Sequence, residues 1–325
     1  MSTAATTFRD HAARDRALHE LGLDARAPSV VAPLFEVEAF RRLRYWVTER
    51  DAIRLAKEAG KPKPWTRNEH LQTARFCNVY RLHDKVSKYL MDTWYADDFL
   101  ASHAQIAVNV AIARLINWPD TLEELRAGRL NENYNSSTAR NVLCARRDRG
   151  EKVFTGAYKV SGIRGEDKVT TVIGQFDRMF KDHARLIDPS SMQRTHLRLQ
   201  EIPAIGSFMA GQIVADLRHV YPGTWADRNT WAPLGPGSQR GIAWLRGWDG
   251  KDERDVPRFG INQANFPASI RQVRDELYAV PGVRAVLERV GAELMDIQNC
   301  LCEFDKISRY SAGLGKPKNK YPGAA

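Results

Sequence analysis

Apolar side chains recur three or four positions apart along most of the chain, which is the spacing of one face of an α-helix. The spacing is regular from Phe35 to Ala59, and a further helix is predicted to begin at Thr66 and to continue to Tyr80. The other helices are predicted at 82–94, 99–116, 121–127, 136–149, 170–186, 190–201, 268–279 and 282–304, and one more immediately after a turn at Gly206. The pattern therefore predicts a mainly α protein.

Three stretches interrupt this spacing. Prolines in residues 60–65 end the first helix, and Thr66 with Glu69 three positions later has the pattern of a capping box. Residues 151–175 combine β-branched, aromatic and glycine residues, so either an irregular loop or a short hairpin is expected. Residues 222–268 are rich in Gly, Pro, Trp and Asn, and so long a segment without periodicity is typical of a functional loop.

The charge of the chain changes this picture. It has 49 Lys and Arg against 39 Asp and Glu, a formal net charge of +10. Such an excess favours a polyanionic partner, most often nucleic acid, although a solvated basic surface with no partner has the same composition. The four cysteines lie at spacings that match neither a zinc site nor a four-cysteine iron–sulfur loop, so free thiols are expected.

The same patterns predict the domain organisation. Residues 1–28 are polar and are interpreted as a leader, 29–312 as a single catalytic domain of two helical lobes, and 313–325 as a flexible basic tail. No apolar run approaches the roughly 20 residues of a membrane span, and the N-terminus lacks the apolar stretch of a signal peptide. We therefore expect a cytoplasmic monomer without a membrane partner.

Residues 197–217 have the pattern of two helices joined by a tight turn. They match L-x-x-[LI]-P-x-[IV]-G-x-x-x-A, the helix-hairpin-helix pattern, in which backbone N–H groups of the turn can hold a DNA phosphate. The predicted DNA contacts are Ile205, Gly206, Ser207 and Phe208. An ordinary turn between two packed helices is the alternative.

This segment resembles the helix-hairpin-helix DNA glycosylases, although Ala204 stands where their first glycine usually lies. The resemblance implies a bilobal fold with a central cleft and long irregular loops, and a catalytic Asp downstream of the hairpin glycine. Asp227 lies 21 positions after Gly206 (227 − 206) and is the first candidate for acid–base catalysis. Strand-cleaving members carry a Lys where this chain has Phe208, so a Schiff-base lyase is not expected.

Five further segments narrow the resemblance. They are Pro64-Trp65-Thr66, Arg75-Phe-Cys-Asn78-Val-Tyr-Arg81-Leu-His-Asp84, Val153-Phe-Thr-Gly-Ala-Tyr158, Leu234-Gly-Pro-Gly237-Ser238-Gln-Arg240-Gly241 and Cys302-Glu303-Phe-Asp305-Lys306. In this order around a hairpin they resemble the bacteriophage α-glutamyl/putrescinyl thymine pyrophosphorylases, or amino acid:DNA transferases, over residues 35–310. That family usually has Tyr after the last lysine, where this chain has Ile307.

The resemblance implies a reaction in the host-cell cytoplasm on double-stranded DNA that carries modified uracil. A small amine, either an amino acid or a polyamine, displaces pyrophosphate from the exocyclic methylene of 5-pyrophosphomethyluracil. Such an enzyme would flip the nucleotide out, deprotonate the amine and balance the charge of the leaving group. No cofactor is required with certainty, and Mg²⁺ is one group that could balance that charge.

Two motifs are candidates for binding pyrophosphate. On a helix, Arg75, Asn78 and Arg81 would line one stripe and form a cradle, unless they belong to a solvated face or an Arg–Asp pair. The glycines of 235–241 are predicted to form a loop in which Gly237, Ser238 and Arg240 approach a phosphate or base, with a plain surface turn as the alternative. The loop lacks the Lys-Ser/Thr ending of a P-loop, so ATP binding is not expected.

The remaining candidates each have a structural alternative. Gln212 and Asp216 would form an exposed pair on the second hairpin helix, or Asp216 would face the cleft beside Asp227. Glu303 and Lys306 would be a catalytic and a substrate-binding group, or a buried ion pair. The aromatic residues that could stack on a flipped base, or else belong to the core, are Tyr158, Trp65, Trp225 and Trp231.

Three functions fit these observations. The first is an amine transferase on modified DNA, which accounts for every motif. A monofunctional DNA glycosylase that excises a modified base explains the hairpin, Asp227 and the charge, but not the other motifs. A noncatalytic DNA-binding module leaves the long segment 222–268 without a purpose.

Overall fold

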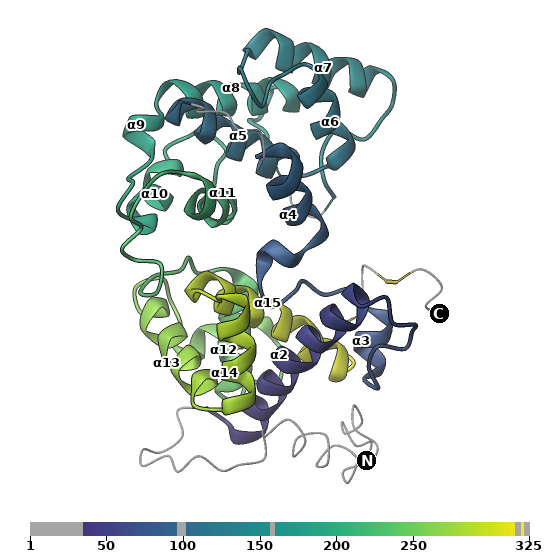
Figure 1. Cartoon of the computed structure of the whole chain (residues 1–325). Coiled ribbons are helices and arrows are strands. Elements are labelled where there is room, and N and C mark those ends of the chain that lie inside the picture. The colour runs from purple at the N-terminus through teal and green to yellow at the C-terminus, as the bar shows by residue number, and fades with distance from the viewer. Residues whose placement is uncertain (1–34, 96–101, 157–159, 316–319, 322–325) are drawn as a thin grey trace. The chain divides into compact units, whose positions relative to one another are not determined.

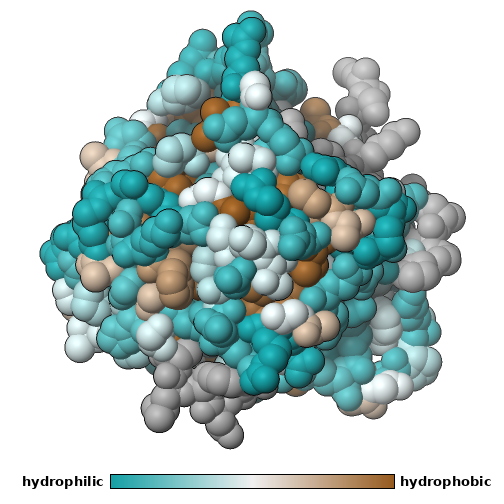
Figure 2. All heavy atoms as spheres, turned by 90° about the horizontal axis from the view of Figure 1, so that it is seen from above, coloured by the Kyte–Doolittle hydropathy of each residue, from teal (hydrophilic) through white to brown (hydrophobic). Residues whose placement is uncertain are grey.

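The computed structural model describes residues 35–95, 102–156, 160–315 and 320–321, so the predicted leader lies outside it. Helices make up most of this part (Figure 1), and its only β pairing is a single antiparallel bridge between Ala74 and Lys320. The prediction of a mainly α protein is confirmed. None of the described helices combines the length and the apolar character needed to cross a bilayer. Hydrophilic side chains cover most of the face in Figure 2, with hydrophobic atoms in small separate groups.

The chain divides into two compact units, residues 1–81 with 234–325, and residues 82–233. In the first unit α12 packs closely on α15, and α13 and α2 also contact α15 (Figure 1). The helices of this unit are α2 (Val37–Glu58), α3 (Glu69–Thr73), α12 (Pro236–Leu245), α13 (Phe266–Tyr278), α14 (Pro281–Val290) and α15 (Leu294–Ser311), with a 3₁₀ turn η3 (Glu253–Phe259).

The second unit is built around α5 (His103–Ile116), which is apolar on all sides and has eleven of its fourteen residues buried. Helices α8 and α11 pack against it. The other elements here are α4 (Lys85–Tyr89), η2 (Leu90–Trp94), α6 (Pro119–Ala127), α7 (Ser136–Asp148), α8 (Lys168–Lys181), α9 (His183–Leu186), α10 (Met192–Leu199) and α11 (Ser207–Val220). A short 3₁₀ turn η1 (Arg81–His83) spans the division between the units.

Local signals account for many of the helix ends. The side chains of Asn135 and Asp167 cap α7 and α8 by accepting backbone N–H bonds. Asn117 takes a left-handed conformation and ends α5, and Pro119 begins α6 at a position where its missing N–H costs nothing. Residues 160–167 and 151–156 form no strand, so the irregular loop is the correct alternative for the described part of 151–175.

Three predicted elements are wrong. The helix predicted from Thr66 to Tyr80 covers only α3, and Asn68 rather than Thr66 caps it. The predicted helix 282–304 is two helices, because Gly291 at φ +65° ends α14 before α15 begins. The predicted loop 222–268 contains α12 and η3, whose glycines and prolines disguised their helical character.

Candidate functional site

The predicted site residues separate into two sets, one in each unit. The first unit holds Arg75, Asn78, Arg81, Gly237, Ser238, Arg240, Glu303 and Lys306. The second holds Ile205, Gly206, Ser207, Phe208, Gln212, Asp216 and Asp227. Tyr158 lies outside the described residues, so its predicted role in stacking stays a prediction.

The proposed cradle of Arg75, Asn78 and Arg81 is not a helical stripe. After α3 ends at Thr73, residues 75–78 have no regular structure and only 81–83 form a 3₁₀ turn. Arg75 is exposed, whereas Asn78 is buried. The three side chains therefore do not line one face, because successive side chains of a non-helical segment do not repeat every three or four positions.

Instead, the segment 76–81 is fastened along α15 by polar contacts at successive turns of that helix. The backbone N–H of Cys77 donates to Glu303 Oε2 at 3.1 Å, and that of Arg81 donates to Asp296 Oδ1 at 3.4 Å. Between them, Asn299 donates its side-chain N–H to the carbonyl of Asn78 at 3.2 Å. Two of the five segments that carried the family resemblance, around Arg75–Arg81 and Cys302–Lys306, are thus in direct contact.

Glu303 and Lys306 form an ion pair on α15. Glu303 is 2% exposed and its two oxygens accept from Lys306 Nζ and the N–H of Cys77, whereas the Lys306 side chain is 49% exposed. Burial lowers the pKa of Lys306, but the charge and hydrogen bond of Glu303, together with the charges of Cys77 and Cys302, outweigh it and raise that pKa above its usual value. The alternative of a buried ion pair therefore describes Glu303, whereas Lys306 presents a positive charge to solvent.

The prediction that Gly237 and Ser238 lie in a loop is wrong, and their predicted contact with a phosphate stays a prediction. Both belong to α12, and Ser238 is fully buried, where its hydroxyl exchanges hydrogen bonds with the backbone of Gly235 at 3.1 and 3.0 Å. A Cβ added at Gly237 would lie 3.2 Å from Cys302, and one at Gly241 would overlap the backbone carbonyl of Leu301. The glycines serve the close packing of α12 on α15.

Arg240 is held by a buried carboxylate of α15. Its Nε donates to Asp305 Oδ2 at 2.8 Å, and the indole of Trp244 donates to Asp305 Oδ1 at 3.1 Å. Burial raises the pKa of Asp305, with Arg240 and Trp244 opposing the rise. On the same helix, burial raises the pKa of the Cys302 thiol to about 12, so Cys302 is not a thiolate nucleophile at neutral pH.

In the second unit, α10 and α11 are joined by a turn over residues 200–206 and pack on each other, as the hairpin pattern predicts. Ala204, at the usual position of a glycine, has φ +62°, a left-handed conformation that disfavours a Cβ. Gly206 precedes α11 with no side-chain cap, and a Cβ there would meet open space. Phe208 is 48% exposed on the first turn of α11, and Leu197 of α10 is 58% exposed.

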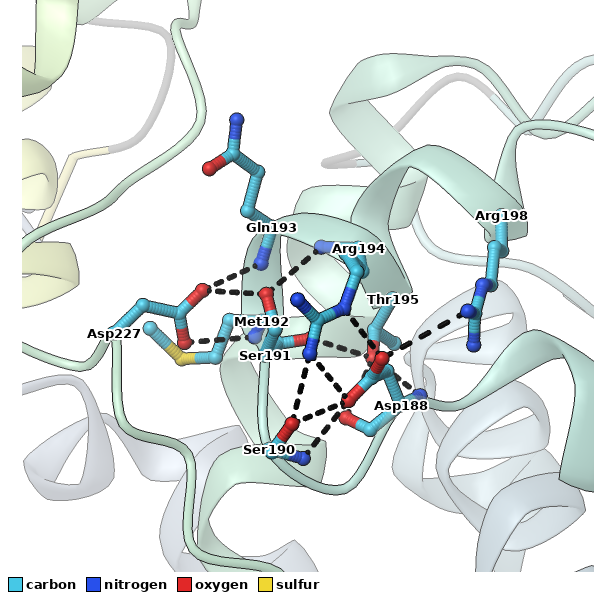
Figure 3. A network of polar contacts seen from close by, with 9 residues as sticks. All are labelled: Asp188, Ser190, Ser191, Met192, Gln193, Arg194, Thr195, Arg198 and Asp227. Atoms are coloured by element: carbon cyan, nitrogen blue, oxygen red, sulfur yellow. Dashed lines mark hydrogen bonds and ion pairs between the residues drawn. The ribbon is translucent and has the colours of Figure 1, made fainter.

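Asp227 is fastened to the start of α10 (Figure 3). Its Oδ2 accepts from Ser191 Oγ and from the N–H of Gln193, both at 2.9 Å, and its Oδ1 accepts from the N–H of Met192 at 2.8 Å. A carboxylate at a helix N-terminus satisfies unpaired donors and interacts favourably with the helix dipole. The structure therefore adds a capping role to the residue predicted as catalytic, and the catalytic role stays a prediction.

A second carboxylate, Asp188, organises the same helix start (Figure 3). It accepts from Arg194 Nε at 2.5 Å and from the N–H and hydroxyl of Ser190 at 3.0 and 2.8 Å. These bonds, with that from Arg194 the strongest, hold the pKa of Asp188 well below its usual value. The loop after α11 packs closely on the backbone at Pro189, because a Cβ on Gly223 would overlap the carbonyl of Pro189.

The two readings of Asp216, an exposed pair with Gln212 or a group facing the cleft, are both wrong. Asp216 is fully buried, and Arg114 of α5 binds it in a bidentate ion pair with N–O distances of 2.6 and 2.5 Å. The hydroxyl of Tyr95 donates to the same carboxylate at 2.9 Å. Because every oxygen faces a donor, Asp216 fastens α11 to α5 and does not present a reactive group.

The loop after α11 contains two tryptophans that were predicted to stack on a base. Both are core residues, since Trp225 is 1% and Trp231 is 3% exposed. Trp231 packs against the ring of His196, with centroids 5.2 Å apart, and the indole N–H of Trp225 donates to the carbonyl of Tyr221. The prediction that they stack on DNA is wrong, because neither presents a ring face.

Several residues that contact or lie near the candidate site residues were not identified from the sequence. Arg114 is a single cation inside the apolar run of α5, a signal that predicts a buried partner because unpaired buried charges are costly. Asp188 precedes two serines and a helix, a pattern typical of a turn with an N-cap. No local signal predicts the contact of Asp296 with Arg81, 215 positions apart.

The described residues do not fit a magnesium site. Protein sites for Mg²⁺ need carboxylate oxygens that face the ion. No group of three or more His, Cys, Asp or Glu that could hold a metal ion is found in the part of the chain that the structure describes. The carboxylates of Asp216, Glu303 and Asp305 are each paired with an Arg or Lys, and that of Asp227 accepts hydrogen bonds from the start of α10, so we assign no step to the ion.

Comparison with known proteins gives one family. The model described as 5-hmdU DNA kinase, helical domain, matches residues 37–315. A curated relative, the 5-hmdU DNA kinase of Bacillus phage SP10, is 28% identical over 209 residues, which are 57% of this chain and 32% of the relative. The match thus spans about a third of that relative's length. No solved structure matches the chain.

Proposed function

The chain belongs to the family of the 5-hmdU DNA kinase helical domain, and from this premise we propose that it is an enzyme of thymidine hypermodification that acts on DNA. The family match over residues 37–315 is the observation that carries the proposal. The net charge of +10 supports a polyanionic substrate. The name of the phage relative includes 5-hmdU in DNA, and we propose that a derivative of this nucleoside is the substrate here.

The proposed reaction is amine transfer with release of pyrophosphate. The amine nitrogen forms a bond to the exocyclic methylene carbon, and the bond from that carbon to the pyrophosphate oxygen breaks, with its electron pair leaving on the oxygen. The nitrogen then loses one proton, for which a carboxylate is the expected acceptor. The products are an amine-bearing thymine in DNA and free pyrophosphate.

Pyrophosphate leaves more readily when cations balance its charge. We propose Lys306 for this task, because its side chain presents a cation to solvent and its partner Glu303 binds the segment fastened along α15. Arg240 is a positioning residue in this proposal, since its Nε is engaged by the buried carboxylate of Asp305. Glu303 likewise positions Lys306 and the backbone of Cys77.

The α10–α11 hairpin is proposed to hold the DNA backbone at Gly206 and Ser207. Its supporting features are the uncapped start of α11 and the exposed aromatic ring of Phe208 beside it. Asp227 fixes the preceding helix through its three hydrogen bonds. We propose that it positions the hairpin, and that any proton transfer by Asp227 acts in addition to this.

The name of the relative makes phosphorylation of the DNA base the second candidate function. Two observations favour transfer over phosphorylation. The match spans 32% of the kinase, in a segment described as helical. The sequence also contains no G-x-x-x-x-G-K-[ST] motif to cradle nucleotide phosphates.

One assay separates the candidates. The protein is incubated with DNA that carries 5-hydroxymethyluracil and ATP, and separately with DNA that carries 5-pyrophosphomethyluracil and a mixture of glycine, serine, glutamate and putrescine. Nucleosides from each digest are identified by mass spectrometry. An amine-bearing nucleoside with an equal amount of pyrophosphate is expected in the second reaction.

Other products would overturn the proposal. A phosphorylated nucleoside formed from ATP means a kinase, and free base with abasic sites means a glycosylase. Lys306→Ala should lower transfer at least tenfold, the effect of losing one charge-assisted contact to the leaving group. Lys251→Ala is the matched control, because Lys251 is an exposed cation of the same unit that pairs only with its neighbour Asp249.

A further inference from the structure

Three cations surround one aromatic ring near the C-terminal end of the chain. Lys57 Nζ lies 4.2 Å from the ring centroid of Tyr321, Lys63 Nζ 5.3 Å and the guanidinium carbon of Arg75 5.7 Å. Trp65 completes the group, with its centroid 5.7 Å from that of Tyr321 and the same two lysines over its own ring at 4.7 and 5.3 Å. We call these five residues the basic–aromatic cluster.

The cluster is assembled from segments far apart in the chain. Lys57 is in the last turn of α2, Lys63 and Trp65 are in the proline-containing segment that follows, and Arg75 comes after α3. Tyr321 is fastened there by its N–H, which donates to the carbonyl of Thr73 at 2.9 Å, and by its hydroxyl, which lies 2.6 Å from Lys57 Nζ. Tyr321 lies beyond residues 37–315, which match the family, and the other four residues of the cluster lie within them.

The electrostatics of the cluster favour an anion. Lys57 and Arg75 form no ion pair with a carboxylate of the described residues. Burial lowers the pKa of Lys57, and the charges of Arg50 and Arg75 lower it further, against the hydrogen bond that Lys57 donates to the Tyr321 hydroxyl. The nearby carboxylates of Asp51 and Glu58 are both paired with Arg54. The like charges of Lys57 and Arg75, which have no carboxylate partner among the described residues, would be stabilised by a polyanion.

We propose that the basic–aromatic cluster is a second DNA-binding surface, which holds the phosphate backbone of the substrate duplex in addition to the contact proposed for the hairpin. This inference rests on the proposed function for its ligand. Lys57 and Arg75 neutralise phosphates, while the rings of Trp65 and Tyr321 order the cations and offer flat surfaces to sugar and base. Clustered cations interleaved with aromatic rings are the combination that nucleic-acid surfaces use.

The test is the salt dependence of DNA binding. Binding of the full chain to an unmodified duplex is measured by fluorescence anisotropy over a range of salt concentrations. Each neutralised phosphate contributes about one to the slope of log affinity against log salt. Lys57→Gln with Arg75→Gln should lower this slope by about two, whereas the control pair Lys251→Gln with Arg254→Gln, two exposed cations of the same unit, should leave it unchanged.

A second measurement does not depend on a variant that folds. The wild-type chain is acetylated with and without the duplex, and modified lysines are quantified by mass spectrometry. DNA should protect Lys57 and Lys63 and leave Lys251 reactive. Three results would overturn the proposal of a DNA-binding surface. They are an unchanged slope in the variant, equal reactivity of Lys57 with and without DNA, and protection of Lys57 by inorganic pyrophosphate but not by DNA.

These outcomes are separable from those of the proposed function. Binding uses unmodified DNA and needs no turnover, so a lowered slope with protection of Lys57 supports the surface even where the nucleoside assay detects no transfer. An unchanged slope together with normal transfer overturns the surface and leaves the proposed reaction in place.

Discussion

The carboxylate of Glu303 accepts a hydrogen bond from the backbone N–H of Cys77, 226 positions away in the chain. The same carboxylate pairs with Lys306 one turn further along α15. One buried acid thus joins an extended segment to a helix and orients a cation that reaches solvent. Two of the five segments of the family resemblance are joined by it.

Replacement of this acid should separate its two tasks. Glu303→Gln keeps the acceptor for Cys77 but removes the charge that balances Lys306, so we expect the free energy of unfolding to fall by about 1–3 kcal/mol. Glu303→Ala should cost more, because it also leaves the Cys77 N–H without its acceptor. Urea denaturation measures both, and equal stabilities for the two variants would contradict the bond to Cys77.

Gly241 should tolerate no larger side chain. A Cβ there overlaps the carbonyl of Leu301, so Gly241→Ala must separate α12 from α15 and should cost about 1–3 kcal/mol. Gly174→Ala in α8 is the control, because a Cβ there meets nothing within 4 Å and alanine favours a helix by about 1 kcal/mol. Thermal unfolding should shift in opposite directions for the two variants, and a shift in the same direction would contradict this packing.

Ala204 should be improved by the glycine that the hairpin pattern usually contains. At φ +62° the alanine Cβ costs about 1–2 kcal/mol, which glycine would relieve. Part of this gain is lost again, because glycine has more conformational freedom in the unfolded chain. We expect Ala204→Gly to raise the free energy of unfolding by up to about 1 kcal/mol. Chemical denaturation tests this, with Ala204→Val expected to lower it.

Asp227 can be tested as a cap and as a catalyst at once. Ser191→Ala removes the cap that Ser191 gives to the N–H of Arg194 and one of the three donors to Asp227, at a cost of about 1 kcal/mol, but keeps the carboxylate and its two backbone donors. Asp227→Asn should cost a similar amount. If Asp227 also transfers a proton, the rate of the folded Asp227→Asn enzyme should fall by about 100-fold or more, and that of Ser191→Ala should not. Equal rates would leave Asp227 as a cap alone.

Asp188 should make stability depend on acid. Arg194 and Ser190 lower its pKa in the folded state, so its contribution is fully present above its unfolded pKa of about 4 and is lost as pH falls below that value. Asp188→Asn should therefore be less stable than wild type at pH 6, with the difference shrinking towards pH 3. Urea midpoints at the two values measure it, and a difference that is constant with pH would contradict the assignment.

The sequence by itself determined the class of the fold and most of its helices. The regular apolar spacing of α2, α5 and α7 is local information, and so are the caps at Asn135 and Asp167. The pair of helices α10 and α11 with the turn between them was also predictable, because the turn residues and the apolar residues on either side lie within about two helical turns of each other. These signals suffice where a segment's structure follows from its own residues.

Only the tertiary structure decided the site. Residues 75–81 have apolar positions that suit a helix, yet the acids of α15 bind their backbone N–H groups and hold them outside any helix. The glycines of α12 have the sequence pattern of a loop, but the structure shows that they allow the close approach of α15. Asp216 has the sequence pattern of an exposed residue, but it is buried in an ion pair with Arg114 of α5. In each case the residue that determines the conformation or burial is far away in the chain. A local sequence pattern therefore cannot predict which partner a buried group will contact.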